Sequence, residues 1–303
     1  MDQARELLGL AREAFAAGKA VDALAPAEAA YTILLRDHGP DHSSTVNGCF
    51  ALCAILEALG RYADAEVYAR RAMAGTESLS DRRLRVNALA RLATVERIQS
   101  RLDSAEDLYR QAIALAGPGH PDMVALLTGL GVVYKYARRF DEAESLYRKA
   151  LAMVGPDSPR AATIWHNLGG LDHSRRRYAS GEQHARQSVE LRLRTLPPDH
   201  PTVAADQAAL ASLLAGQGKW DEAEVLYREA LAVFERAYGP DHYEVAVTLN
   251  DLGALMAARG ENAEAERHYT RSLEIKRRLF GADHPEIALT VRNREHLPAR
   301  PGT

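Results

Sequence analysis

One leucine returns at nearly regular intervals through almost the whole chain. The copies are separated by 42, 40, 38, 38, 42 and 42 residues. A period of this length predicts a stacked repeat protein, because each repeat buries its hydrophobic face only against its neighbours. The seven copies are Leu10, Leu52, Leu92, Leu130, Leu168, Leu210 and Leu252.

The residues around each leucine repeat as well. The residue after it is always small, and a break follows eight residues after the leucine, most often at a glycine. The breaks are Gly18, Gly60, Ser100, Arg138, Arg176, Gly218 and Gly260. A small residue stands five positions beyond each break: Ala23, Ala65, Ala105, Ala143, Gly181, Ala223 and Ala265. This arrangement predicts two helices per repeat, which the small residues allow to approach closely while the leucine fills the groove between them.

The connectors between repeats are equally regular. Most contain Gly-Pro followed by Asp-His or a close variant, as in Gly39-Pro40-Asp41-His42 and Gly239-Pro240-Asp241-His242. Gly-Pro predicts the turn, and the Asp, His or Ser that follows predicts a cap for the next helix. The histidines in these connectors are therefore interpreted as turn and cap residues. Pro26 lies where the second helix of repeat one is expected, and predicts a helix that starts late or kinks.

The pattern resembles the tetratricopeptide repeat (TPR), in the long form found in kinesin light chains. It is clearest in Leu210-Ala211 and in Gly218-Lys219-Trp220-Asp221-Glu222-Ala223. The resemblance implies an all-α, right-handed superhelical solenoid in one domain over residues 1–303, with a concave groove that binds peptides or proteins. We expect seven repeats and a C-terminal capping helix. The repeats are expected at about 2–40, 42–80, 81–118, 120–157, 159–198, 200–240 and 242–282, and the cap at about 285–296.

Composition agrees with a helical protein that binds neither nucleic acid nor membrane. The chain is 47% hydrophobic, 26% charged and carries a formal net charge of -3. No apolar run approaches twenty residues and no secretory leader is present, so we expect a cytoplasmic protein; Ala- and Arg-rich usage favours a bacterial one. Cys49 and Cys53 are interpreted as small buried packing residues. A complete array and a fragment of a larger signalling protein both fit the ends of the chain.

The resemblance implies which residues face the groove. Its middle, in repeats three to five, is expected to be basic and rich in hydrogen-bonding groups, and its last third smooth and apolar. Arg and Asn side chains suit an extended peptide with acidic residues or a free carboxylate, although the cations could also solvate an open face. The candidate site residues are Asn87, Arg91, Arg97, Lys135, Tyr136, His166, Asn167, His173 and Asn250.

Two acids stand at positions that the other repeats fill with packing residues. Glu96 and Asp172 correspond to Tyr134, Leu214 and Met256. A buried acid needs a partner, so each is expected to form an internal ion pair or, alternatively, to face a ligand. The proposed partners are Arg97, Arg101, Arg139, Arg176 and Arg177.

Three functions remain open from the sequence. A non-catalytic peptide- or protein-binding scaffold predicts a continuous open groove. A regulatory sensor predicts that a ligand changes the superhelix. An enzyme predicts a closed pocket at repeats four and five using His166 and His173, but the chain contains no catalytic, phosphate-binding or metal-binding motif, so we expect no catalysis, cofactor or metal. The sequence leaves the ligand and the oligomeric state open.

Overall fold

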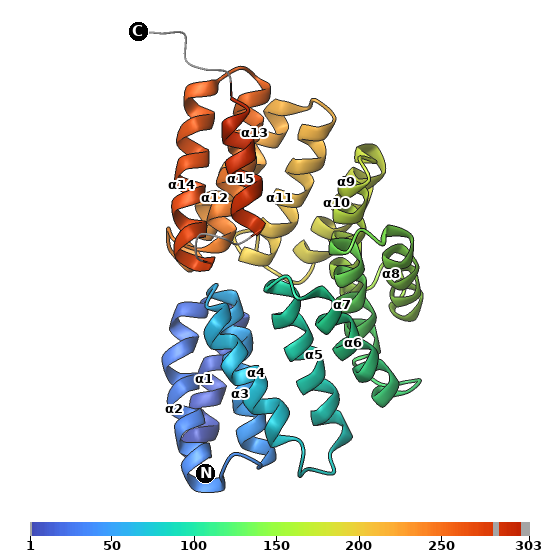
Figure 1. The fold of residues 1–303 in the computed structure, drawn as a ribbon, viewed down its shortest axis with the longest axis vertical. Helices are drawn as coiled ribbons and strands as arrows, with labels where there is room; N and C mark the ends of the chain where they lie inside the picture. The colour runs from blue at the N-terminus through green and yellow to red at the C-terminus, as the bar shows by residue number, and fades with distance from the viewer. Residues whose placement is uncertain (1, 281–284, 298–303) are drawn as a thin grey trace.

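The computed structural model describes residues 2–280 and 285–297, which form fifteen α-helices and one short 3₁₀ helix, η1 (Pro159–Ala161). Consecutive helices pack in pairs to form a solenoid, with α15 packed on α14 at its end (Figure 1). The predicted fold class is therefore confirmed. The helices are α1 (Asp2–Ala16), α2 (Ala20–His38), α3 (Ser43–Ala58), α4 (Tyr62–Gly75), α5 (Arg82–Ile98), α6 (Leu102–Ala116), α7 (Met123–Tyr136), α8 (Phe140–Val154), α9 (Ala162–Ser174), α10 (Tyr178–Leu193), α11 (Pro201–Gly216), α12 (Trp220–Tyr238), α13 (Tyr243–Ala258), α14 (Asn262–Phe280) and α15 (Pro285–Glu295).

The repeated leucine and its small neighbour pack as expected. Six of the seven leucines are at most 7% exposed. The small residue makes room for an aromatic ring of the second helix: a Cβ added at Gly131 would lie 2.5 Å from the ring of Tyr147. Leu10 departs from the prediction and is 51% exposed. Leu10 lies in α1, and the structure describes no repeat before this helix that could cover it.

The breaks between paired helices all have a left-handed backbone. The four glycine breaks have φ between +70° and +80°, and Ser100, Arg138 and Arg176 adopt φ of 57–61°. Glycine enters this region without steric cost, so the three other residues carry local strain that the surrounding helix pair sustains. The predicted helix stop is therefore correct at all seven positions. The prediction for Pro26 is wrong in one respect, because α2 already starts at Ala20 and runs through the proline.

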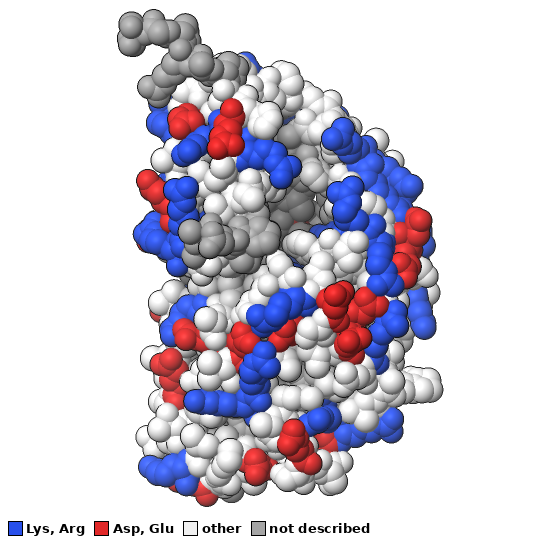
Figure 2. Space-filling view, in the orientation of Figure 1, with Lys and Arg blue, Asp and Glu red and all other residues white. Residues whose placement is uncertain are grey.

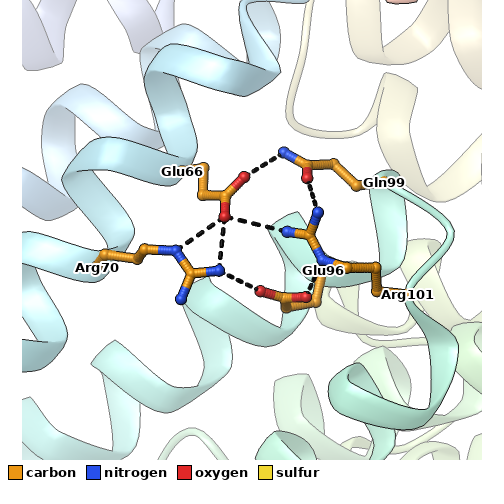
Figure 3. Close-up of polar contacts among 5 residues, drawn as sticks. All are labelled: Glu66, Arg70, Glu96, Gln99 and Arg101. Carbon is orange, nitrogen blue, oxygen red and sulfur yellow. Dashed lines mark hydrogen bonds and ion pairs between the residues drawn. The ribbon is translucent and has the colours of Figure 1, made fainter.

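An ionic ladder on the second helices ties neighbouring repeats together. In repeats two to six, a glutamate six residues after the break pairs with the arginine four residues later. The same glutamate also binds a side chain flanking the break of the next repeat. Figure 3 shows one rung, in which Glu66 binds Arg70 and Arg101, while the buried Glu96 also binds both arginines. On the face drawn in Figure 2, acidic and basic side chains lie next to one another over the lower half of the molecule. Exposed pairs of this kind contribute only ~0.2–1 kcal/mol each.

The two buried acids are both satisfied within the solenoid. Glu96 pairs with Arg101, as predicted, and also with Arg70. Asp172 accepts hydrogen bonds from Ser180 at 2.7 Å and lies 3.0 Å from Nδ1 of His184. The arginines proposed for Asp172 are therefore wrong, because the carboxylate points at α10 and not at the break that carries Arg176.

The solenoid curls until its two ends touch. In Figure 1, α11–α14 lie end to end with α1–α4, and α12 contacts α2. Nε2 of His200 lies 3.3 Å from the carbonyl oxygen of Ala16, and Nε2 of His242 lies 2.5 Å from that of Ala58. Both pairs are 184 residues apart, so repeats one and two meet repeats six and seven through the same contact. The expectation of a groove open along its whole length is therefore wrong where these repeats meet.

Candidate functional site

A cavity of about 670 Å³ lies on the inner side of the curled solenoid. Its walls come from repeats two to five, from repeat seven and from α15, so it exists only because the ends of the solenoid meet. Five of the predicted site residues line it: Arg97, Lys135, Tyr136, His166 and Asn167. The other lining residues are Glu57, Tyr62, Ile98, Ser100, Leu102, Val132, Tyr243, Glu244, Phe280 and Leu289.

Two cations on successive first helices converge at one aromatic ring. The Arg97 guanidinium, from α5, lies 5.6 Å from the ring centre of Tyr136, and the Lys135 ammonium, from α7, lies 5.0 Å from it. Within the described part of the chain, no carboxylate lies within 4.0 Å of either cation. The inner wall surrounds Lys135, and this burial, together with the charge of Arg97, lowers the pKa of its ammonium group to about 8. The pair is therefore a concentrated positive charge that forms no ion pair with the described residues, although the charge of Glu57 acts on Arg97 from a longer distance.

His166 is oriented by a buried carboxylate on the next repeat. Its Nδ1 lies 2.7 Å from Oδ1 of Asp206, in close contact but poorly aligned for a hydrogen bond. Asp206 is 2% exposed and also accepts hydrogen bonds from Ser188 at 2.8 Å and from Arg192 at 3.1 Å. Because Nδ1 faces Asp206, the opposite edge of the imidazole, with Nε2, is the edge available to the cavity.

Two carboxylates flank the positive centre. Glu57, from α3, accepts a hydrogen bond from the Cys53 thiol at 3.1 Å and lies 3.8 Å from Arg91. Glu244, from the first turn of α13, has no cation within 4.0 Å among the residues described. Burial raises the pKa of both carboxyl groups. The cavity is thus positive at α5 and α7 and acidic at α3 and α13.

The remaining predicted residues lie elsewhere. Asn87 and Arg91 line a second cavity of about 410 Å³, together with Thr94 and Tyr109. His173 lies outside both linings, with its ring edge-on to Tyr178, and burial on the concave wall together with the charge of Lys135 lowers its pKa. The structure therefore does not bring His166 and His173 together as the predicted acid–base pair.

Asn250 is not a groove residue. It is 7% exposed, donates to Asp251 and accepts a hydrogen bond from Asn293 of α15 at 3.2 Å. The prediction for Asn250 is wrong, since it assumed an open groove and α15 covers that position.

Sequence reasoning missed several residues of the site. Asp206 had one detectable signal: Ser188 stands where five of the other six repeats have alanine, and its hydroxyl bonds Asp206 and the carbonyl of Ala162. Tyr62, Tyr243 and Phe280 had none, because their rings meet across one turn of the solenoid. In residues 2–280 and 285–297, no helix has the length and apolar character needed to cross a bilayer. The same residues contain no cluster of three His, Cys, Asp or Glu side chains able to hold a metal.

Paired helices, left-handed breaks and an inner ligand-sized cavity define a helical-repeat solenoid. The family model described as tetratricopeptide repeat matches residues 47–116, 84–154, 160–235 and 206–278. The chain belongs to the tetratricopeptide repeat family. Members of this family generally act as protein-interaction scaffolds, and the chain is such a scaffold.

Solved structures show the same fold at low sequence identity. A Rap protein complexed with competence and sporulation factor is 15% identical, with a TM-score of 0.65, and the match covers 96% of this chain and 80% of that one. A chain of the APC/C hetero-tetramer Cut9-Hcn1 is 14% identical with a TM-score of 0.63, and the match covers 96% of this chain and 48% of that one. BtubC (BKLC) from P. vanneervenii is 19% identical with a TM-score of 0.51, and covers 77% and 92%. No curated protein matches the chain in sequence.

Proposed function

We propose that the chain binds an acidic segment of a partner protein or peptide in the inner cavity, with Arg97 and Lys135 as the carboxylate-binding pair. The observation that carries this function is the absence of a carboxylate within 4.0 Å of either cation in the described part of the chain, although both lie in the same cavity. In the ionic ladder, by contrast, arginines do have carboxylate partners: Glu66 pairs with Arg70 and Arg101. Glu106 pairs with Arg110 and Arg139 in the same way. A ligand carboxylate would replace the missing partner.

The chemistry of the neighbouring residues supports this ligand. Arginine binds a carboxylate through two parallel hydrogen bonds, and lysine adds a point charge. Asn167 lines the same wall and can both donate to and accept from a peptide backbone. The cavity of about 670 Å³ is large enough for a few residues but not for a folded domain. Similar solenoids were solved with partner molecules, competence and sporulation factor on Rap and Hcn1 with Cut9.

Calorimetry with end-blocked peptides tests this function. The acidic probe is Glu-Glu-Gly-Gly-Gln-Gln, and the neutral control replaces both glutamates by glutamine. We expect the acidic peptide to bind and the Arg97→Glu and Lys135→Glu variants each to weaken it at least tenfold, because a like charge then faces the ligand. Arg267→Glu is the matched control, since Arg267 is 71% exposed and lies outside the lining. Equal binding of the acidic and neutral peptides would rule out the proposal.

A second function, a ligand-responsive sensor, is favoured by the way the ends of the solenoid meet. Tyr243 and Glu244, which line the cavity, directly follow His242, which contacts Ala58. A ligand in the cavity would therefore bias the end-to-end contact. Small-angle scattering with and without the acidic peptide tests this: a sensor predicts a changed radius of gyration, and a rigid scaffold predicts the same radius in both states.

A further inference from the structure

Glu244 stands out among the acids of the inner surface. Its carboxylate lines the cavity and has no cation within 4.0 Å in the described part of the chain, although Glu57, Glu96 and Asp206 each have an arginine within that distance. A half-buried carboxylate without an ion pair is energetically unfavourable. The charge of His166 favours ionised Glu244 but forms no ion pair with it, and burial raises the pKa of the carboxyl group. The same cavity holds Arg97 and Lys135, which have no carboxylate within 4.0 Å among the described residues, although the charge of Glu57 acts on Arg97. Glu244 lies more than 4.0 Å from both cations, and all three residues line the same cavity.

An aromatic wall adjoins this carboxylate. Tyr243 precedes Glu244 in α13, and its ring meets Phe280 of α14 edge-on at 5.6 Å. Tyr62 of α4 stacks on Phe280 at 5.5 Å. All three residues line the cavity. A wall of aromatic carbon excludes water and strengthens any charge pair formed beside it, and aromatic rings also attract cations.

We propose that the cavity takes a bipolar ligand, a peptide segment whose carboxylate binds Arg97 and Lys135 and whose ammonium or guanidinium group binds Glu244. This inference rests on the proposed function and adds a second subsite to it. The ligand pairs with charges of both signs at once, which accounts for one cavity with acidic and basic groups that form no ion pair with the described residues. A purely acidic ligand would leave Glu244 unpaired and would place further negative charge near it.

The experiment compares three end-blocked peptides by calorimetry: Glu-Glu-Gly-Gly-Lys-Lys, the acidic peptide Glu-Glu-Gly-Gly-Gln-Gln, and the basic peptide Gln-Gln-Gly-Gly-Lys-Lys. Versions with one to four glycines set the distance between the charges. We expect the best bipolar peptide to bind at least tenfold more tightly than the acidic one. Glu244→Gln should abolish this gain and leave the acidic peptide unchanged or slightly tighter. Glu190→Gln is the control, since Glu190 is 60% exposed on α10 and outside the cavity.

Each result of the calorimetry leads to one conclusion. Equal affinity for the bipolar and acidic peptides at every spacing overturns the bipolar inference and leaves the proposed function intact. A bipolar gain that survives Glu244→Gln also overturns it, because the cation then binds elsewhere. No binding of either acidic peptide, or tightest binding of the basic peptide, overturns the proposed function itself. Thermal unfolding of each variant confirms that the solenoid is folded when binding is measured.

Discussion

The imidazole of His242 joins α13 to the end of α3, through the carbonyl of Ala58, across 184 residues of chain. Its Nδ1 accepts a hydrogen bond from the backbone N–H of Glu244 at 3.2 Å, and its Nε2 donates to the carbonyl oxygen of Ala58 at 2.5 Å. One neutral side chain thus caps its own helix and satisfies the last turn of another. The positive end of the α13 dipole also meets the negative end of α3, so the two helices attract each other end to end.

Loss of the contact between His242 and Ala58 should lower the free energy of unfolding more than loss of a helix cap alone. His42 is the matched comparison, because its Nδ1 caps α3 through the N–H of Ser44 without a described contact to another turn. We expect His42→Ala to lower the free energy of unfolding by ~1 kcal/mol and His242→Ala by a further ~1–3 kcal/mol, because the Ala58 carbonyl is left without its partner. Urea unfolding measures both values, and equal losses would mean that the contact contributes no stability.

Acid should weaken the same contact. Burial lowers the pKa of His242 to about 4, whereas the unfolded chain titrates near its ordinary value of 6.5. The unfolded state therefore takes up a proton first. The contribution of His242 is complete above pH 6.5, falls as pH drops, and is lost by pH 4. Between pH 7.5 and 4, the free energy of unfolding of wild type should fall by roughly 3 kcal/mol more than that of His242→Asn, in which the asparagine keeps a helix cap but does not titrate. If the free energy of unfolding of the two proteins depends on pH in the same way, the loss of stability in acid does not come from His242.

The small residue beside the repeated leucine should be intolerant of a methyl group. In Gly131→Ala, the new Cβ would meet the Tyr147 ring at 2.5 Å, and Tyr147 is fully buried. We expect a loss of about 1–3 kcal/mol in the free energy of unfolding. Gly9→Ala is the control, because nothing lies within 4 Å of its Cβ position and alanine favours a helix by ~1 kcal/mol. A stable Gly131→Ala protein would show that the helix pair separates easily.

One ion pair of the ladder, between Arg175 and Glu144, should contribute more to stability than an exposed pair does. Arg175 is 9% exposed and binds both Glu144 and Asp141. Glu144→Gln should cost about 1–3 kcal/mol, because a nearly buried guanidinium loses its main counter-charge. Asp141→Asn removes the fully exposed partner and should cost less than ~1 kcal/mol. Chemical denaturation of both variants checks the order, and the reverse order would contradict it.

The sequence predicted the repeat architecture because packing within a repeat depends on nearby residues. The leucine, its small neighbour and the break all lie within one helix pair, and their spacing is visible in the chain. The family resemblance implied that Arg97, Lys135 and His166 face the groove, and all three line the inner cavity. Sequence reasoning missed Glu244 as a cavity residue and misplaced Asn250. Both errors come from contacts between separate helix pairs, the meeting of repeats two and seven and the packing of α15, which no local period encodes.

Selective acylation of Lys135 provides the most direct test of the account. The chain has five lysines, and mass spectrometry follows each one separately. With its pKa lowered to about 8, Lys135 is half deprotonated at pH 8 and should react faster than the exposed Lys149. A saturating acidic peptide should then slow the acylation of Lys135 at least tenfold and leave the acylation rate of Lys149 unchanged. An unchanged rate at Lys135 with the peptide bound would contradict a carboxylate site in the inner cavity.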